Sequence, residues 1–146
     1  MNYSRIALAA LGATVAYFVL GGILFAALPS LRKEFMKYPA VYRTQDDMKR
    51  VMPIGMISIL VAIFVVAVLY AMAHPGGGGV LDGARFGALI GVFAVCGFAL
   101  HNHMILNIGI KLTVGQAIAY FLQWLVVGIV ISLIYAPAQS MVGLRL

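Results

Sequence analysis

The stretch that decides the fold is residues 51–72, which read VMPIGMISILVAIFVVAVLYAM. These 22 residues contain no charged side chain. A helix of about 20 residues crosses the roughly 30 Å of hydrocarbon in a bilayer, because each residue adds about 1.5 Å. Pro53 suits the first turn of such a helix, where its missing N–H is harmless. The stretch therefore predicts a membrane-spanning helix that begins near residue 51.

Three further apolar stretches have a similar length and predict the same structure: residues 6–28, 86–106 and 116–135. Prolines and a glycine-rich turn separate or end the four stretches: Pro29, Pro75–Gly79 and Pro137. The first stretch is a poor signal peptide because a proline follows its small residues directly, so we expect it to be retained. Hydrocarbon offers no partner to unpaired backbone groups, which favours helices. We expect an all-α integral membrane protein, a bundle of four transmembrane helices.

The composition supports one membrane domain over residues 1–146. Hydrophobic residues make up 64% of the chain and charged residues only 10%, whereas soluble domains carry about 25% charged residues. So few charges could not cover the surface of a soluble domain. The net charge of +6 comes mainly from one connector, so we do not expect nucleic acid as a partner.

The distribution of basic residues predicts the orientation. Seven lie on one predicted side of the membrane: Arg32, Lys33, Lys37, Arg43, Lys49, Arg50 and Lys111. Three lie on the other side: Arg5, Arg85 and Arg145. Cytoplasmic loops carry the excess of Lys and Arg. We therefore expect a bacterial inner-membrane protein whose N- and C-termini lie outside the cytoplasm.

The first connector, residues 30–50, combines aromatic and basic side chains. Phe35, Tyr38 and Tyr42 recur at helical spacing among the basic residues, although Pro39 interrupts any continuous helix. This pattern is typical of a segment that lies at the lipid headgroups. The alternatives are an ordinary positive-inside loop and lipid-specific recognition. The expected lipid-interface residues are Arg32, Lys33, Phe35, Lys37, Tyr38 and Tyr42.

The two halves of the chain resemble each other. The first and third stretches match at an offset of 75 residues, which pairs Gly12 with Gly87, and the second and fourth match at 65, which pairs Tyr70 with Tyr135. Two hairpins of the same sense would form a parallel repeat about an axis along the membrane normal. Small residues let membrane helices approach closely. The glycines expected at helix contacts are Gly12, Gly22, Gly87, Gly91 and Gly97.

Thr113 and Gln116 stand at the spacing of a capping box. In that motif the threonine hydroxyl serves a backbone N–H three residues on, and the glutamine reaches back to the cap. The motif predicts that the fourth helix opens here, with residues 107–112 as a tight turn.

A polar cluster in the third stretch is the candidate intramembrane site: His101, Asn102, His103, with Gln123 from the fourth stretch. Such residues usually face a bundle interior, a cavity or a partner. His101 and His103 are roughly 200° apart around a helix, so one metal ion cannot easily bind both, and we expect no metal. Structural hydrogen bonding, a single histidine ligand for a haem or chlorin, and a proton or ion route remain open. We expect Gln123 to bond to His101 or His103, because antiparallel helices bring them to a similar depth.

No catalytic set accompanies this cluster, because no acid or base stands near a serine nucleophile. The sequence favours a non-enzymatic protein that acts through helix contacts, as a homo-oligomer or an accessory subunit, with membrane lipids and other membrane subunits as partners. The alternatives are a small transporter or channel for a neutral or lipid-like solute, and a subunit that binds a tetrapyrrole. The layout loosely resembles small bacterial four-helix membrane proteins classed as domains of unknown function, which implies no activity.

Overall fold

The computed structural model describes residues 2–27 and 29–136, except for the side chains of residues 29–31. Every regular element among these residues is helical. The elements are α1 (Tyr3–Ala27), α2 (Pro29–Phe35), α3 (Gln45–Ala73), α4 (Val80–Ala94), the π-helix η1 (Val95–Leu100), α5 (His101–Ile105) and α6 (Ile110–Tyr135). Since α4, η1 and α5 follow one another as a single rod, the described chain has four helices long and apolar enough to cross a membrane.

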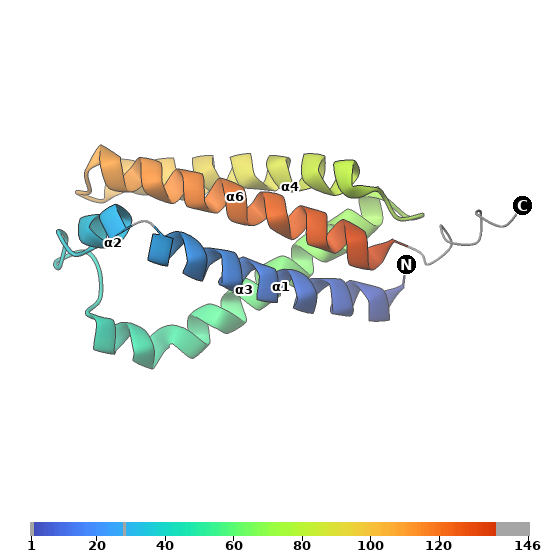
Figure 1. Ribbon diagram of the computed structural model, residues 1–146, viewed down its shortest axis with the longest axis horizontal. Helices are drawn as coiled ribbons and strands as arrows, with labels where there is room; N and C mark the ends of the chain where they lie inside the picture. The colour runs from blue at the N-terminus through green and yellow to red at the C-terminus, as the bar shows by residue number, and fades with distance from the viewer. Residues whose placement is uncertain (1, 28, 137–146) are drawn as a thin grey trace, which may run out of the picture.

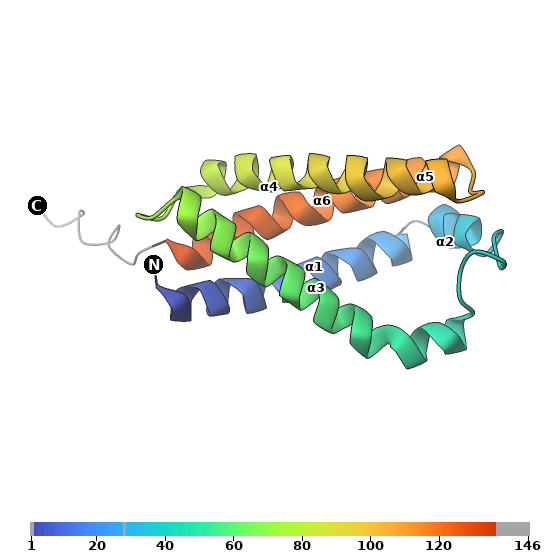
Figure 2. The ribbon, with the colours of Figure 1, turned by 180° about the vertical axis from the view of Figure 1, so that it is seen from behind.

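Helix α6 is the centre of the bundle. It packs along α4 on one side and along α1 on the other, and these are the two most extensive contacts between elements. Helix α3 crosses α1 obliquely, and its first turns diverge from the other helices (Figures 1 and 2). The bundle is therefore closed at the end that holds the N-terminus and splayed at the end that holds the first connector.

Glycine allows α4 and α6 to lie in backbone contact. An added side chain on Gly87 would meet the Trp124 carbonyl oxygen and the backbone of Leu125, and one on Gly128 would meet the backbone of Gly83 and Gly87. In a membrane, such close approach supplies the van der Waals contact that holds helices together.

The expected packing glycines do not all lie at such contacts. Gly87 and Gly91 face α6, with Gly91 against Phe121, and Gly12 faces Ile134 of α6. Gly22 and Gly97 have open space where a side chain would stand. These two glycines therefore contact no other helix closely within the described chain, and their packing role stays a prediction.

The main apolar core lies in the closed half of the bundle. It is built from small side chains of α1 and larger ones of α3 and α6: Ile6, Ala9, Ala10, Ala13, Ile63, Ala67, Tyr70, Val127, Ile131 and Tyr135. In contrast, the first buried residue of α3 is Ile63, and most residues of α3 before Ile59 are exposed. The internal repeat is not shown, because α4 packs closely on α6 whereas α3 diverges from α1.

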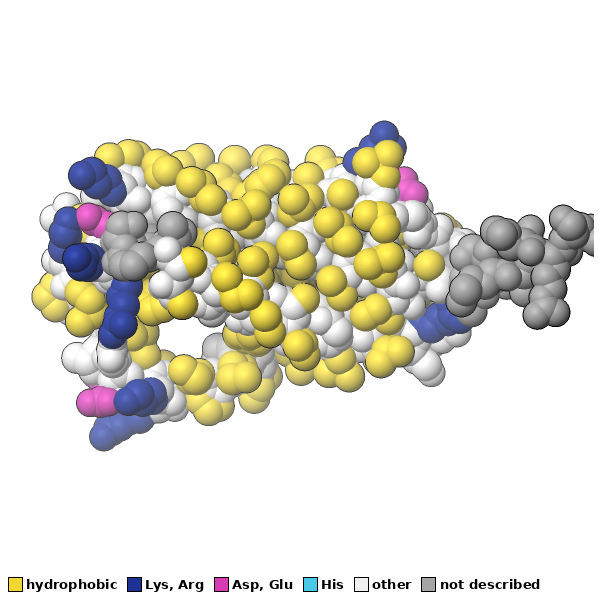
Figure 3. Space-filling model, viewed as in Figure 1, with side chains coloured by type: hydrophobic (Ala, Val, Ile, Leu, Met, Phe, Trp, Pro, Cys, Tyr) yellow, Lys and Arg dark blue, Asp and Glu magenta, His cyan; other side chains and the backbone are white. Residues whose placement is uncertain are grey.

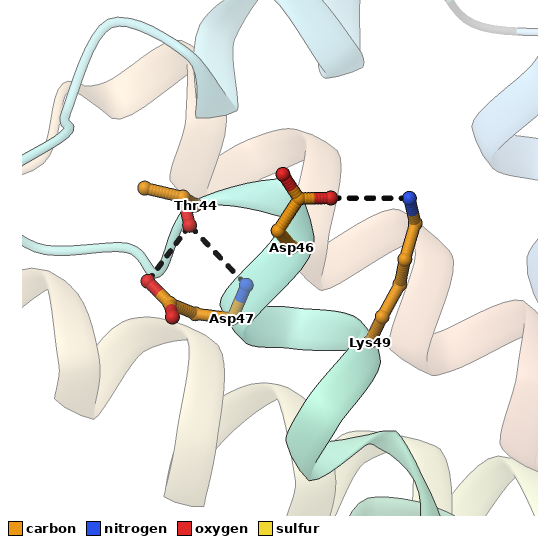
Figure 4. A network of polar contacts seen from close by, with 4 residues as sticks. All are labelled: Thr44, Asp46, Asp47 and Lys49. Atoms are coloured by element: carbon orange, nitrogen blue, oxygen red, sulfur yellow. Dashed lines mark hydrogen bonds and ion pairs between the residues drawn. The ribbon is translucent and has the colours of Figure 1, made fainter.

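Three of the long helices begin about six residues before the apolar stretches do. Helix α3 begins at Gln45, where the Thr44 hydroxyl accepts a hydrogen bond from the Asp47 N–H at 3.2 Å and donates to the Asp47 carboxylate at 2.7 Å (Figure 4). Asp46, which accepts from Lys49 at 3.2 Å, also suits the positive end of the helix dipole. Pro53 consequently lies inside the helix rather than in its first turn.

The start of α4 follows the glycine-rich turn. Gly77 has a φ of 81°, which only glycine adopts easily, and the Gly79 N–H donates to Asp82 at 2.9 Å. Helix α6 also begins early, at Ile110, with Gly109 as its N-cap. The capping box expected at Thr113 and Gln116 is wrong, because the Thr113 hydroxyl turns back to the Gly109 carbonyl oxygen at 3.4 Å.

Candidate functional site

The first half of α6 carries a row of polar side chains on one face. Thr113, Gln116 and Gln123 are buried and Tyr120 is half-buried, and steps of three or four residues place them one above another on a helix. Among the described residues, the other buried side chains with a polar group are Ser132, near the opposite end of α6, and the tyrosines Tyr17, Tyr70 and Tyr135. The polar face therefore belongs to the half of the bundle that faces the first connector.

Each buried side chain of this face reaches a different element. The Thr113 hydroxyl lies 2.9 Å from Nδ1 of His103, Gln116 donates to the Tyr42 hydroxyl at 3.2 Å, and Gln123 donates to the Tyr17 carbonyl oxygen at 3.2 Å. Polar side chains that bond across helices stabilise membrane bundles modestly, by about 0.6 kcal/mol each. The face thus joins α6 to α1, to α5 and to the first connector.

The hydrogen bond expected between Gln123 and His101 or His103 is wrong. Gln123 points toward α1, where Gly21 leaves room for its amide. His103 pairs instead with Thr113, within the same hairpin, while His101 is exposed on α5 and Asn102 is half-buried. Gln123 and His103 therefore bond to different elements, Gln123 to α1 and His103 to Thr113 of α6.

The π-helix η1 explains part of this arrangement. It follows Ala94 and ends at Leu100, immediately before His101. A π-helix winds less tightly than an α-helix, so it rotates every later side chain relative to the α-helical expectation. No feature of the apolar sequence predicted it. Among the described side chains, no three His, Cys, Asp or Glu residues gather where they could hold a metal ion.

The aromatic residues of the first connector pack against protein. Phe35, Tyr38 and Tyr42 cover Ile108, in the turn before α6, and Leu112, in the first turn of α6, forming a second apolar cluster. The Tyr38 hydroxyl accepts a hydrogen bond from the Gly109 N–H at 2.8 Å. The expected interface residues thus include three aromatic side chains that fasten the connector to the start of α6.

The basic residues of the first connector lie at the splayed end of the bundle. Arg32, Lys33 and Lys37 are exposed there, and Lys and Arg side chains gather at this end in Figure 3. The hydrogen bond from Lys37 to Glu34, at 2.5 Å, raises the pKa of Lys37 above its ordinary value of 10.5. Lys37 is therefore a fixed positive charge at neutral pH.

One polar atom of the site is unsatisfied. Oε1 of Gln116 is buried and has no hydrogen-bond partner within the described chain. A buried acceptor without a donor costs about 1–3 kcal/mol. Sequence reasoning missed Gln116, Tyr42 and Tyr17 as partners, although the spacing of Thr113, Gln116 and Gln123 was a readable signal.

The chain matches no protein-family model, and no curated protein and no solved structure is similar enough to match it. The resemblance to small four-helix membrane proteins therefore rests on the layout of the helices alone.

Proposed function

We propose that this protein is a non-enzymatic integral membrane protein that acts through helix–helix contacts, as a homo-oligomer or as an accessory subunit of a larger membrane complex. Its proposed setting is the bacterial inner membrane, with the first connector in the cytoplasm and both termini outside, because basic residues gather on the connector side. The observation that carries the proposal is the bare first half of α3, by which we mean residues 52–58, all of which are exposed.

The proposed repeat allows this exposed surface of α3 to be compared with the corresponding surface of α6. At the offset of 65 residues, buried positions of α3 coincide with buried positions of α6: Ile63 with Gly128, Val66 with Ile131, Ala67 with Ser132 and Tyr70 with Tyr135. At the same offset, Val51 and Ser58 of α3 correspond to Gln116 and Gln123 of α6, which other elements bury. In the proposed repeat, α3 therefore presents a face whose counterpart on α6 is covered.

Small residues on the outer surface support the same proposal. Gly22, Gly55 and Gly97 all have open space where a side chain would stand. The contact between α4 and α6 shows how this chain uses glycine, namely for direct backbone approach. An additional helix on the bare half of α3 would meet the flat surface at Gly55.

Native electrophoresis after extraction in a mild detergent tests the proposal. We expect the wild-type protein to migrate well above the 15.6 kDa of one chain, and Gly55→Leu to reduce the larger species. Leu89→Phe is the matched control, because Leu89 is an exposed apolar residue of α4. A wild-type protein that migrates as a clean monomer would contradict the proposal.

A second candidate function, transport of a neutral or lipid-like solute, is favoured by the unsatisfied Oε1 of Gln116. A water-accessible route beside α6 would supply its missing donor. The test uses a Cys96→Ser background, because Cys96 is exposed, with single cysteines in place of Gln116 or of Ile63. A route predicts that an aqueous maleimide modifies the first and spares the second, which lies in the apolar core. Equal protection of both cysteines would exclude the route.

A further inference from the structure

A cavity of about 500 Å³ separates the first connector from the first turns of α3. Figure 3 shows a gap through the molecule at this end, where the Lys and Arg side chains gather. Phe25 of α1, Met48 of α3, and Phe35 and Tyr42 of the first connector all line the cavity. The Phe35 and Tyr42 rings pack edge to face, with centroids 4.8 Å apart.

Two arginines, Arg32 and Arg43, line the same cavity. All four acidic residues of the chain form polar contacts with residues other than these two arginines: Glu34 with Lys37, Asp46 with Lys49, Asp47 with Thr44 and Asp82 with Gly79. Neither arginine forms an ion pair with an acidic side chain of the described chain. Arginine is the side chain best suited to phosphate, because its planar fork donates two parallel hydrogen bonds.

A separate apolar groove lies between α1 and α3. It has a volume of about 370 Å³ and is lined by Thr14, Val15, Phe18, Val19, Met56, Ile57 and Leu60. These residues lie nearer the middle of the two helices than Phe25 and Met48 do. The splayed half thus has a cationic rim at the bilayer surface and an apolar groove deeper in the membrane.

We propose that this splayed half binds one anionic phospholipid from the leaflet on the connector side. The phosphate lies between Arg32 and Arg43, and one acyl chain passes Phe25 and Met48 into the groove between α1 and α3. The arginines lie toward the end of the bundle and the apolar groove lies deeper. A phospholipid has the same order, because its phosphate lies at the membrane surface and its acyl chains lie in the interior. The site also accounts for two arginines without acidic partners beside an apolar cavity.

Native mass spectrometry of the protein released from mixed bilayers tests the proposal directly. The bilayers contain equal amounts of phosphatidylglycerol and phosphatidylcholine. We expect one phosphatidylglycerol to remain bound to each chain, with at least about tenfold preference over phosphatidylcholine, because both lipids carry the phosphate but phosphatidylcholine adds a choline cation that the two arginines repel. Inorganic phosphate at millimolar concentration should not displace the bound lipid, since the contacts of its acyl chain supply much of the affinity.

Substitutions separate the site from general attraction between charges. The Arg32→Gln, Arg43→Gln double variant should lose the bound lipid, whereas Lys33→Gln, Arg50→Gln should retain it. The control removes the same charge at the same end, and neither Lys33 nor Arg50 lines the cavity. Met48→Trp should fill the cavity and exclude the acyl chain, whereas Met52→Trp, one turn further along α3, should not.

Equal retention of the two lipids by the wild-type protein would overturn the proposal, as would displacement by phosphate alone. Equal loss in the two double variants would reduce the effect to surface charge and would also overturn it. The lipid site does not depend on the proposed oligomer. Because the same spectra report the mass of the assembly, a monomer that retains one phosphatidylglycerol would contradict the proposed function and support this inference.

Discussion

The two helical hairpins of this chain, α1 with α3 and α4 with α6, differ in how closely their helices pack. In the second hairpin, Gly87 of α4 and Gly128 of α6 bring two backbones into direct contact. In the first hairpin, alanines of α1 meet larger side chains of α3 at one crossing, without backbone contact through paired glycines, and the first turns of α3 then diverge. The difference teaches that small residues determine how long two helices stay together, because the apolar character of all four helices is similar.

The largest effect is expected from Gly87→Leu. The new side chain would meet backbone atoms of α6, which cannot rotate away, so α4 and α6 must separate. Overpacking of this kind costs about 3 kcal/mol. Reversible unfolding in detergent micelles measures the free energy, with Gly22→Leu as the control because Gly22 faces open space. Equal losses in both variants would show that α4 and α6 do not depend on close backbone contact.

A smaller effect is expected from Gly21→Ala, compared with Gly22→Ala. A methyl group at Gly21 meets the Gln123 amide and disturbs its hydrogen bond to Tyr17, whereas one at Gly22 meets nothing. Both substitutions gain helix propensity, so the difference isolates the contact, and we expect Gly21→Ala to be less stable by about 1 kcal/mol. Identical unfolding curves would place the contact between α1 and α6 in another register.

The smallest effect is expected from Met56→Ala in the bare half of α3. Met56 is 47% exposed, and replacing an exposed residue changes stability by less than about 0.5 kcal/mol. The comparison with Ile63→Ala, in the core of the same helix, should show a loss of about 3 kcal/mol for the buried site. A large loss for Met56→Ala in the isolated monomer would mean that α3 does not diverge from the bundle.

The four helices could be predicted from the sequence because apolar length alone reports them. The first residues of these helices could not be predicted, since hydropathy detects where charged residues end rather than where a helix begins. The first turns of α3 are polar, and the Thr44 cap with Asp46 and Asp47 was the available local signal. The early start of α6 at Gly109 and Ile110 had no comparable signal.

The candidate site was harder to predict because it depends on register. Gly22 was among the glycines expected at helix contacts, yet its neighbour Gly21 makes the contact with Gln123. The partner of Gln123 could not be derived from depth alone, since depth does not report which face of a helix meets which neighbour. The π-helix before His101 further rotated the end of its span.

The divergence of α3 gives the molecule the form of a wedge. Within a bilayer, its broad end would displace more lipid from one leaflet than its narrow end displaces from the other. Such a wedge would relieve lipid packing stress where the leaflet that holds the broad end is convex. It would add packing stress where that leaflet is concave. The angle between α1 and α3 would therefore couple this protein to the local shape of the membrane.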